Sequence, residues 1–298
     1  MTVGYVYLDH NVVDRIDTPL RDTLLCFFQE NELTPVVSTA SLGEIERSGR
    51  ADRVEACITA LLGIGSQFIL ENDSRIHIVQ LSVQQIQDLL ASKNTLVADT
   101  VSAVNAAQFH LISATSRDEL EQRLSEINKD VQALIRRHDG AKTAESLLEL
   151  MRLMDAIKIG GIPDEFNWAC DLRSRLGIDP QEINNLRPKD LWMIIEEATL
   201  AKGASLPFDA STGPIRERIY NALMTLNALG YWADGIESSA RQLAFNYDCM
   251  HGIYGAICKA IISSDKRFLC RLRAVYHYLG IGTRIAFIRA GQIIEAGD

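Results

Sequence analysis

Short, nearly continuous apolar runs lie at both ends of the chain. Residues 3–8 and 34–38 form such runs near the N-terminus, and residues 259–263 and 284–288 form them near the C-terminus. Runs of this length and composition are typical of strands that are buried on both faces of a parallel sheet. The pattern therefore predicts an α/β fold, in which a small parallel sheet is flanked by helices.

Other segments predict edge strands and helices around this sheet. Residues 68–70 and 76–81 flank a turn signal and are expected to be short strands or edge segments. Helices are expected where apolar residues recur every three or four positions, in residues 18–31, 40–62, 82–90, 180–185, 188–200, 215–229 and 268–278. Residues 238–246 are expected to be helix or linker, and Asn246 can cap a helix that begins at Tyr247.

The middle of the chain, roughly residues 82–230, has helical character throughout. Residues 116–137 form an amphipathic pattern that begins with a capping box, and residues 143–159 continue in the same way. Residues 202–214 are the most loop-like segment. The chain therefore has a mainly helical block between two ends of α/β character.

Composition indicates an ordinary globular protein. The 298 residues are 47% hydrophobic and 23% charged, with a net charge of −9. This charge argues against a protein held to nucleic acid mainly by its overall electrostatics, although a local basic patch is compatible with it. The six cysteines include no CxxC pair and are expected to be buried in a reducing compartment. With no signal peptide and no membrane-spanning run, we expect a soluble cytoplasmic protein.

Four acidic residues occupy positions where α/β folds place their sites. Asp9 and Asp265 each follow a predicted strand, while Glu44 and Asp248 lie near the start of predicted helices. In a parallel sheet these positions share one edge. Carboxylates packed together repel one another unless a cation binds them, and Mg²⁺ and Mn²⁺ prefer oxygen ligands. An alternative for Asp9 is a helix N-cap.

The motifs around these acids resemble those of the PIN and PIN-like nuclease family. The resemblance rests on YLDHNVV, STASLGEI, NYDCMHGIYGA and ISSDKRF and covers about residues 1–60 and 235–290. It implies a small parallel sheet flanked by helices and cleavage of RNA, or of structured DNA, with Mg²⁺ or Mn²⁺. By similarity, the metal-binding acids are Asp9, Glu44, Asp248 and Asp265, with Asn11 and Ser264 as supporting polar residues.

The chain is longer than a minimal PIN-like domain. We therefore expect a split nuclease core in residues 1–81 and 235–298, and a helical insertion in residues 82–234 that serves as a substrate lid, a partner surface or a dimer interface. His251 is expected either to contact phosphate or assist proton transfer, or to be a structural histidine. Cations beside the proposed ligands suit contacts to the phosphate backbone, namely Lys266, Arg267, Arg271 and Arg47.

The sequence thus predicts a metal-dependent nuclease, an endoribonuclease in preference to one that cuts DNA. A toxin, a defence effector and an RNA-processing enzyme fit this pattern equally. One alternative is a catalytically silent PIN-like binding or regulatory module. Another is an aspartate-nucleophile phosphatase, because LDHN follows a strand. Asn11 stands where such phosphatases usually carry a second aspartate.

Overall fold

The structure is a computed structural model that describes residues 4–16, 18–47, 51–72, 75–92, 122, 125, 180–202, 210–233 and 239–295. The chain forms two compact units. Unit 1 comprises Met1–Lys93 and Met250–Asp298, and unit 2 comprises Asn94–Cys249. The domain limits expected from the sequence, at residues 81/82 and 234/235, stay a prediction.

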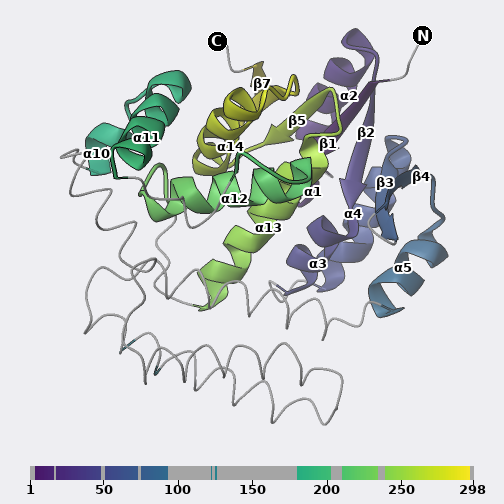
Figure 1. The fold of residues 1–298 in the computed structure, drawn as a ribbon. Helices are drawn as coiled ribbons and strands as arrows, with labels where there is room; N and C mark the ends of the chain where they lie inside the picture. The colour runs from purple at the N-terminus through teal and green to yellow at the C-terminus, as the bar shows by residue number, and fades with distance from the viewer. Residues whose placement is uncertain are drawn as a thin grey trace. The chain divides into compact units, whose positions relative to one another are not determined.

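Unit 1 contains a seven-stranded mixed sheet in the order β4-β3-β2-β1-β5-β6-β7 (Figure 1). The strands are β1 (Gly4–Leu8), β2 (Leu33–Ser38), β3 (Gln67–Asn72), β4 (Arg75–Val79), β5 (Ala260–Ser263), β6 (Arg284–Arg289) and β7 (Gln292–Glu295). Strands β3, β2, β1, β5 and β6 are parallel, while β4 and β7 add antiparallel edges. The α/β class and six of these strands confirm the prediction, whereas β7 was not predicted.

The order of the strands places a switch point between β1 and β5. From β1 the chain proceeds through β2 and β3 on one side, and β5 and β6 lie on the other side. Open α/β sheets bind ligands in the crevice outside the carboxyl ends of the strands, at such a switch point. The residues that follow β1 and β5 therefore occupy the position where a site is expected.

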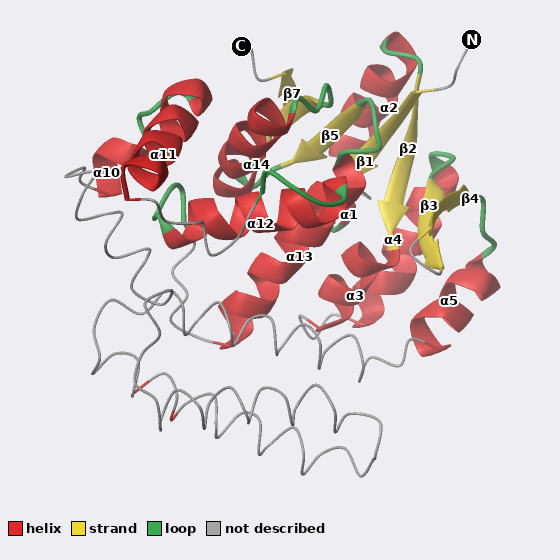
Figure 2. Cartoon of the chain, in the orientation of Figure 1, coloured by secondary structure: helices red, strands yellow, loops and turns green. Residues whose placement is uncertain are grey.

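Helices of unit 1 pack on both faces of this sheet (Figure 2). Alternate residues of β1, such as Val6 and Leu8, contribute to a core with α1 (His10–Val13), α2 (Leu20–Glu30) and α4 (Ala51–Gly63). On the other face Tyr7 packs against Tyr254 of α13 (Ser239–Gly255), with ring centroids 6.2 Å apart. The remaining helices of unit 1 are α3 (Thr39–Arg47), α5 (Val83–Ser92) and α14 (Lys266–Leu279).

Two helix boundaries differ from the prediction. The segment expected to be a single helix at residues 40–62 contains two helices, α3 and α4. The helix expected to begin at Tyr247 begins at Ser239, so Asn246 is not its cap and Asp248 lies inside it. Residues 239–246 contain no Gly or Pro, and helix propagation outweighs the local preference of Asn for a cap.

The described part of unit 2 is helical. It contains α10 (Pro180–Ile183), α11 (Pro188–Lys202), α12 (Ile215–Ala228) and the beginning of α13. These helices confirm the helical pattern expected at residues 180–185, 188–200 and 215–229. The helices expected at residues 116–137 and 143–159 lie outside the described residues, apart from Gln122 and Ser125.

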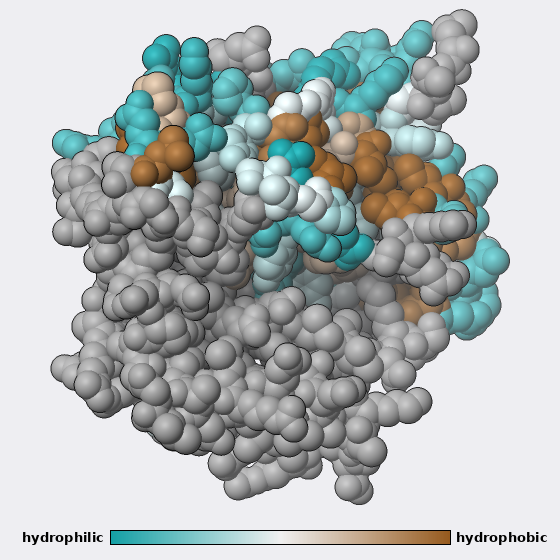
Figure 3. Space-filling view, viewed as in Figure 1, coloured by the Kyte–Doolittle hydropathy of each residue, from teal (hydrophilic) through white to brown (hydrophobic). Residues whose placement is uncertain are grey.

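The described surface mixes polar and apolar residues. On the face in Figure 3, hydrophilic residues in teal surround smaller hydrophobic areas in brown. Among the described residues of unit 1, the large apolar side chains that are exposed are Val83, Ile257 and Ile294. Single exposed apolar residues of this kind are normal. No helix among the described residues is long and apolar enough to cross a membrane.

Candidate metal centre

Asp9 is the central residue of a polar cluster at the carboxyl edge of the sheet. It follows β1 directly, and its backbone amide donates to the carbonyl of Ile262 in β5, at 3.1 Å. Its side chain caps α1 by accepting from the backbone amide of His10, at 2.7 Å. The two roles considered for Asp9, helix cap and site residue, are therefore compatible in one side chain.

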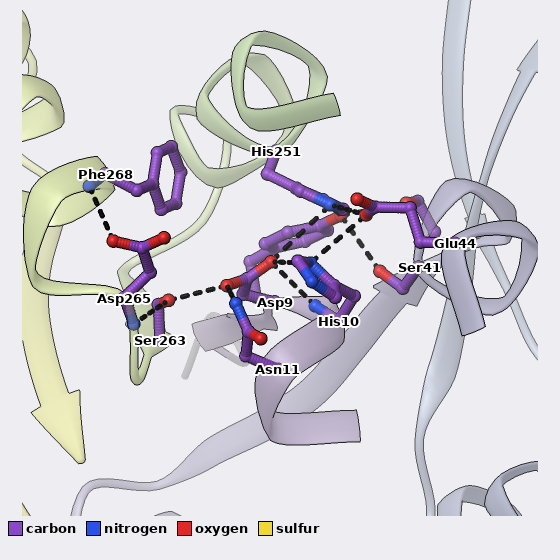
Figure 4. A network of polar contacts seen from close by, with 11 residues as sticks. Asp9, His10, Asn11, Ser41, Glu44, His251, Ser263, Asp265 and Phe268 are labelled. Carbon is purple, nitrogen blue, oxygen red and sulfur yellow. Dashed lines mark hydrogen bonds and ion pairs between the residues drawn. The ribbon is translucent and has the colours of Figure 1, made fainter. Parts of the chain in front are cut away.

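Both carboxylate oxygens of Asp9 have several hydrogen-bond partners (Figure 4). Oδ1 lies 2.9 Å from Nδ1 of His10. Oδ2 accepts from the Ser263 hydroxyl at 2.5 Å and from the Asn11 amide at 3.2 Å. Burial by itself raises the pKa of Asp9, but the charge of His251 and the hydrogen bond with His10 outweigh it and lower the pKa well below its ordinary value. Asp9 is therefore a buried, ionised carboxylate.

His251 approaches the same point from α13. It is fully buried, and its Nε2 lies 2.6 Å from Oε2 of Glu44 and 3.5 Å from Oδ1 of Asp9. Its Nδ1 lies 2.7 Å from the Tyr7 hydroxyl. Burial lowers the pKa of His251, but the charges of Glu44 and Asp9 raise it by more. Both ring nitrogens thus have fixed partners, and Nε2 faces the two carboxylates.

Tyr7 supports His251 from the sheet. Its hydroxyl lies 2.8 Å from Oγ of Ser38 and 3.4 Å from Oγ of Ser41. Burial raises the pKa of Tyr7 well above its ordinary value, so the hydroxyl keeps its proton. Tyr7 and Asp9 are two positions apart at the end of β1 and therefore lie on the same face.

His10 and Glu44 complete the cluster. Nδ1 of His10 lies 3.1 Å from Oε2 of Glu44, the same oxygen that contacts His251. The two imidazole rings are stacked, with centroids 5.6 Å apart. Burial lowers the pKa of His10, but its hydrogen bond and ion pair with Asp9 raise it by more. The side chain of His10 is 26% exposed, and this partial exposure gives the cluster an opening to solvent.

Three side chains of this cluster could hold a metal ion. One donor atom from each of Asp9, His10 and His251 lies within 4.8 Å of the other two. Ligand atoms bound at about 2.1 Å around a tetrahedral metal are about 3.4 Å apart. The separations of 2.9 Å and 3.5 Å from Asp9 Oδ1 to the two histidines are close to this value. Glu44 offers a further carboxylate at the same point, so the residues fit a divalent cation.

The two late aspartates have other surroundings. Oδ1 of Asp265 caps α14 by accepting from the backbone amide of Phe268 at 3.0 Å, and Figure 4 shows the carboxylate turned toward that amide. Its own amide donates to the Ser263 hydroxyl at 3.0 Å, which links it to Asp9 through one residue. Asp248 is a buried residue of α13 in unit 2. Their predicted roles as metal ligands stay predictions.

The predicted substrate-binding cations differ in exposure. Lys266 and Arg267 are exposed at the start of α14, next to Asp265. Arg271 is fully buried, which argues against direct contact with a substrate. Arg47 is the last residue of α3, and its side chain lies outside the described part of the chain.

Three cluster residues were not identified from the sequence. His10 was overlooked although it follows Asp9 directly. Tyr7 was overlooked although it lies on the same face as Asp9 at the end of a predicted strand. Ser264 was expected to support the site, whereas its neighbour Ser263 makes the contact with Asp9. Ser263 is the last residue of β5, and β1 and β5 pair as far as Leu8 and Ile262, so Ser263 and not Ser264 comes beside Asp9.

Comparisons with known proteins do not assign the chain to a family. No protein-family model, no curated protein and no solved structure matches it. The resemblance to PIN-like nucleases thus stays an expectation that rests on the motifs.

Proposed function

We propose that the protein is a divalent-metal-dependent nuclease, with RNA as the first substrate to test, and that unit 1 is its PIN-like core. The observation that carries this proposal is the convergence of Asp9, Glu44, His10 and His251 at the switch point of the sheet. The residues come from α3, α13 and the junction of β1 and α1, and α13 is far from the other elements in sequence. A group of titratable residues with shifted pKa values at the switch point of an α/β sheet is a candidate functional site.

The chain's own residues have separate tasks in this proposal. Asp9, oriented by Ser263 and Asn11, and Glu44 supply negative charge to hold the metal. When bound, a divalent metal in such a centre polarises a phosphate oxygen and lowers the pKa of a water. The exposed Lys266 and Arg267 supply positive charge for the phosphate backbone. His10, which is partly exposed, lies where substrate enters the cluster.

The contacts of Asp9 argue against the phosphatase alternative. An aspartate nucleophile needs one carboxylate oxygen available to attack phosphorus. In this structure Oδ1 accepts from the His10 amide, and Oδ2 accepts from Ser263 and Asn11. The Asn11 amide stands where such a phosphatase usually carries its second aspartate and donates to Oδ2 of Asp9, so this position offers no carboxyl group for proton transfer.

Cleavage of labelled single-stranded RNA and DNA by the full chain, with Mn²⁺ or Mg²⁺, tests the proposal. We expect cleavage that a chelator abolishes and that Asp9→Asn reduces by at least about 100-fold. Asp88→Asn is the matched control, because Asp88 is exposed on α5. Cleavage that persists in Asp9→Asn, or a folded, metal-loaded protein that cuts neither nucleic acid, contradicts the proposal. Hydrolysis of phosphomonoesters alone would favour the phosphatase.

A further inference from the structure

We propose that the cluster is a mixed nitrogen and oxygen centre that selects a first-row transition metal over Mg²⁺, with Asp9, His10 and His251 as its protein ligands. The inference deepens the proposed function, on which it rests only in taking the same cluster as the metal centre. It departs from the four-carboxylate site that the sequence predicts, because two of the three donors are imidazole nitrogens.

The chemistry of the donor atoms favours a transition metal over Mg²⁺. Mg²⁺ prefers oxygen ligands in near-octahedral geometry and keeps several waters. Imidazole nitrogen suits transition metals such as Zn²⁺, Fe²⁺ and Ni²⁺, whose affinity for a given site rises from Mn²⁺ onward. Here Nδ1 of His10 and Nε2 of His251 both face Oδ1 of Asp9. A hard, strongly hydrated ion gains little from two such nitrogens.

The surroundings of His251 carry the second step. Metal-binding histidines usually bond their other ring nitrogen to a fixed partner, which sets the orientation of the ring. Nδ1 of His251 has this partner in the Tyr7 hydroxyl at 2.7 Å, and Tyr7 is itself held by Ser38 at 2.8 Å. The ring is fully buried. The sheet therefore aims Nε2 of His251 at the cluster.

The charge of the cluster carries the third step. Oε2 of Glu44 lies 2.6 Å from His251 and 3.1 Å from His10, so both rings lie between two carboxylates. One divalent cation balances the charge of Asp9 and Glu44 together. Glu44 is the fourth group within reach of such an ion.

The test measures metal binding without reference to catalysis. Chelator-treated full-length protein is titrated calorimetrically with Mn²⁺, Zn²⁺ and Mg²⁺, and the Mn²⁺ form is studied by pulsed electron paramagnetic resonance. We expect affinity in the order Mg²⁺, Mn²⁺, Zn²⁺ from weakest to tightest, and ¹⁴N couplings from two imidazoles. His10→Gln should remove one coupling, and Tyr7→Phe should weaken Mn²⁺ binding by about 10–100-fold.

Matched controls separate these effects from general damage. His277→Gln changes an exposed histidine of α14, and Tyr5→Phe changes a tyrosine of the same strand as Tyr7. Both should bind metal as the wild type does. Because His251→Gln replaces a buried residue, the partly exposed His10 keeps the test decisive if that variant does not fold.

The inference is overturned by Mn²⁺ binding without nitrogen coupling, by Mg²⁺ binding as tight as Mn²⁺, or by equal effects of Tyr7→Phe and Tyr5→Phe. These outcomes are distinct from failure of the proposed function. A protein that binds Mn²⁺ through two imidazoles but cuts no nucleic acid contradicts the nuclease and supports the inference. A protein that cuts RNA with Mg²⁺ and shows no nitrogen coupling supports the nuclease and contradicts the inference.

Discussion

At the scale of single residues, the hydroxyl of Ser263 connects the end of β1 to the start of α14 through two hydrogen bonds. It donates to Oδ2 of Asp9 at 2.5 Å and accepts from the amide of Asp265 at 3.0 Å. Ser263→Ala removes both bonds and leaves a buried carboxylate with one donor fewer. We expect the free energy of unfolding to fall by about 1–3 kcal/mol, measured by urea denaturation.

Ser264→Ala is the control for this substitution. Ser264 is the next residue along the chain and is only partly buried. Its replacement should change the free energy of unfolding by no more than about 0.5 kcal/mol. An equal loss in the two variants would mean that the bonds of Ser263 do not stabilise the fold.

The titration of the cluster gives the metal-free protein a defined pH dependence. Burial raises the pKa of Asp9, but the charge of His251 lowers it by more, so the folded protein has the lower pKa. This difference stabilises the fold above the unfolded pKa of about 3.9, and the stability is lost as the pH falls. The raised pKa values of His10 and His251 contribute stability below about 6.5, which is lost as the pH rises through the folded values. Maximum stability is expected between these limits.

Urea denaturation of chelator-treated protein between about pH 5 and pH 8 measures this dependence. The free energy of unfolding should fall as the pH rises, and His10→Gln should make the fall shallower. With metal present the trend should be reversed, because metal binds the neutral imidazole. If the free energy of unfolding of the chelator-treated protein instead rises from about pH 6 to pH 8, the two histidines do not bind protons more tightly in the folded state.

At the same scale, the sequence predicted some cluster residues and not others. Asp9 and Glu44 were predicted because they lie at the carboxyl edge of a parallel sheet, a position that local patterns reveal. Tyr7 was not predicted, because an aromatic residue within an apolar run indicates core as readily as a hydrogen-bonding role. Its hydroxyl gains a function only when His251, 244 positions away, comes within reach.

At the scale of helices and strands, Gly255 allows α13 to approach β5 and α14 closely. A methyl group at this position would come within 2.7 Å of Ile261 Cδ1 and 2.9 Å of the Tyr276 hydroxyl. That hydroxyl donates to the carbonyl of Gly252 at 2.5 Å, so it has little freedom to move. Gly255→Ala should therefore lower the free energy of unfolding by about 1–3 kcal/mol, measured by chemical denaturation.

Gly282→Ala is the corresponding control. No atom lies within 4 Å of a methyl group built at Gly282, and its φ angle is not in the left-handed region. The substitution should be neutral or slightly stabilising. If Gly255→Ala also proves neutral, α13 and α14 have room to separate and the close approach at Gly255 is not required.

The elements themselves were predictable to different degrees. The parallel strands and the stop of α14 at Gly280, where φ is 67°, follow from local signals. Strand β7 was missed because its hairpin turns at Ala290 and Gly291, with φ of 51° and 78°, where Asn-Gly is the usual signal. The start of α13 was misplaced because a strong local cap residue, Asn246, lies inside a longer helix-forming stretch.

On the scale of the whole molecule, unit 1 is assembled from two segments that are distant in sequence. Residues of β1 pair with β5, and Glu44 contacts His251 across 207 positions. Periodicity predicts each strand but not which strands become neighbours, so convergence of the acids could be expected only from a rule about sheet edges. The contact of His10 and His251 with Asp9 could be found only from coordinates, because it depends on side-chain directions.

Because the cluster joins both segments, metal binding should stabilise unit 1 as a whole. A ligand that binds only the folded state at 100 times its Kd adds about 2.7 kcal/mol to the free energy of unfolding. Hydrogen exchange of β1 and β5 amides measures this gain, and we expect slower exchange with Mn²⁺. All three tryptophans, Trp168, Trp192 and Trp232, belong to unit 2, so their fluorescence reports on the other unit.

Asp9→Asn supplies the decisive comparison for this gain, with Asp88→Asn as the matched control. The variant loses the carboxylate that contacts both histidines and should show no metal-dependent protection of β1 or β5. The control should behave as the wild type does, because Asp88 contacts only Gln84 among the bonds described for it. If the metal binds at Asp9, it cannot protect β1 and β5 in a variant that has lost this carboxylate. Equal protection in both variants would therefore show that the metal binds elsewhere.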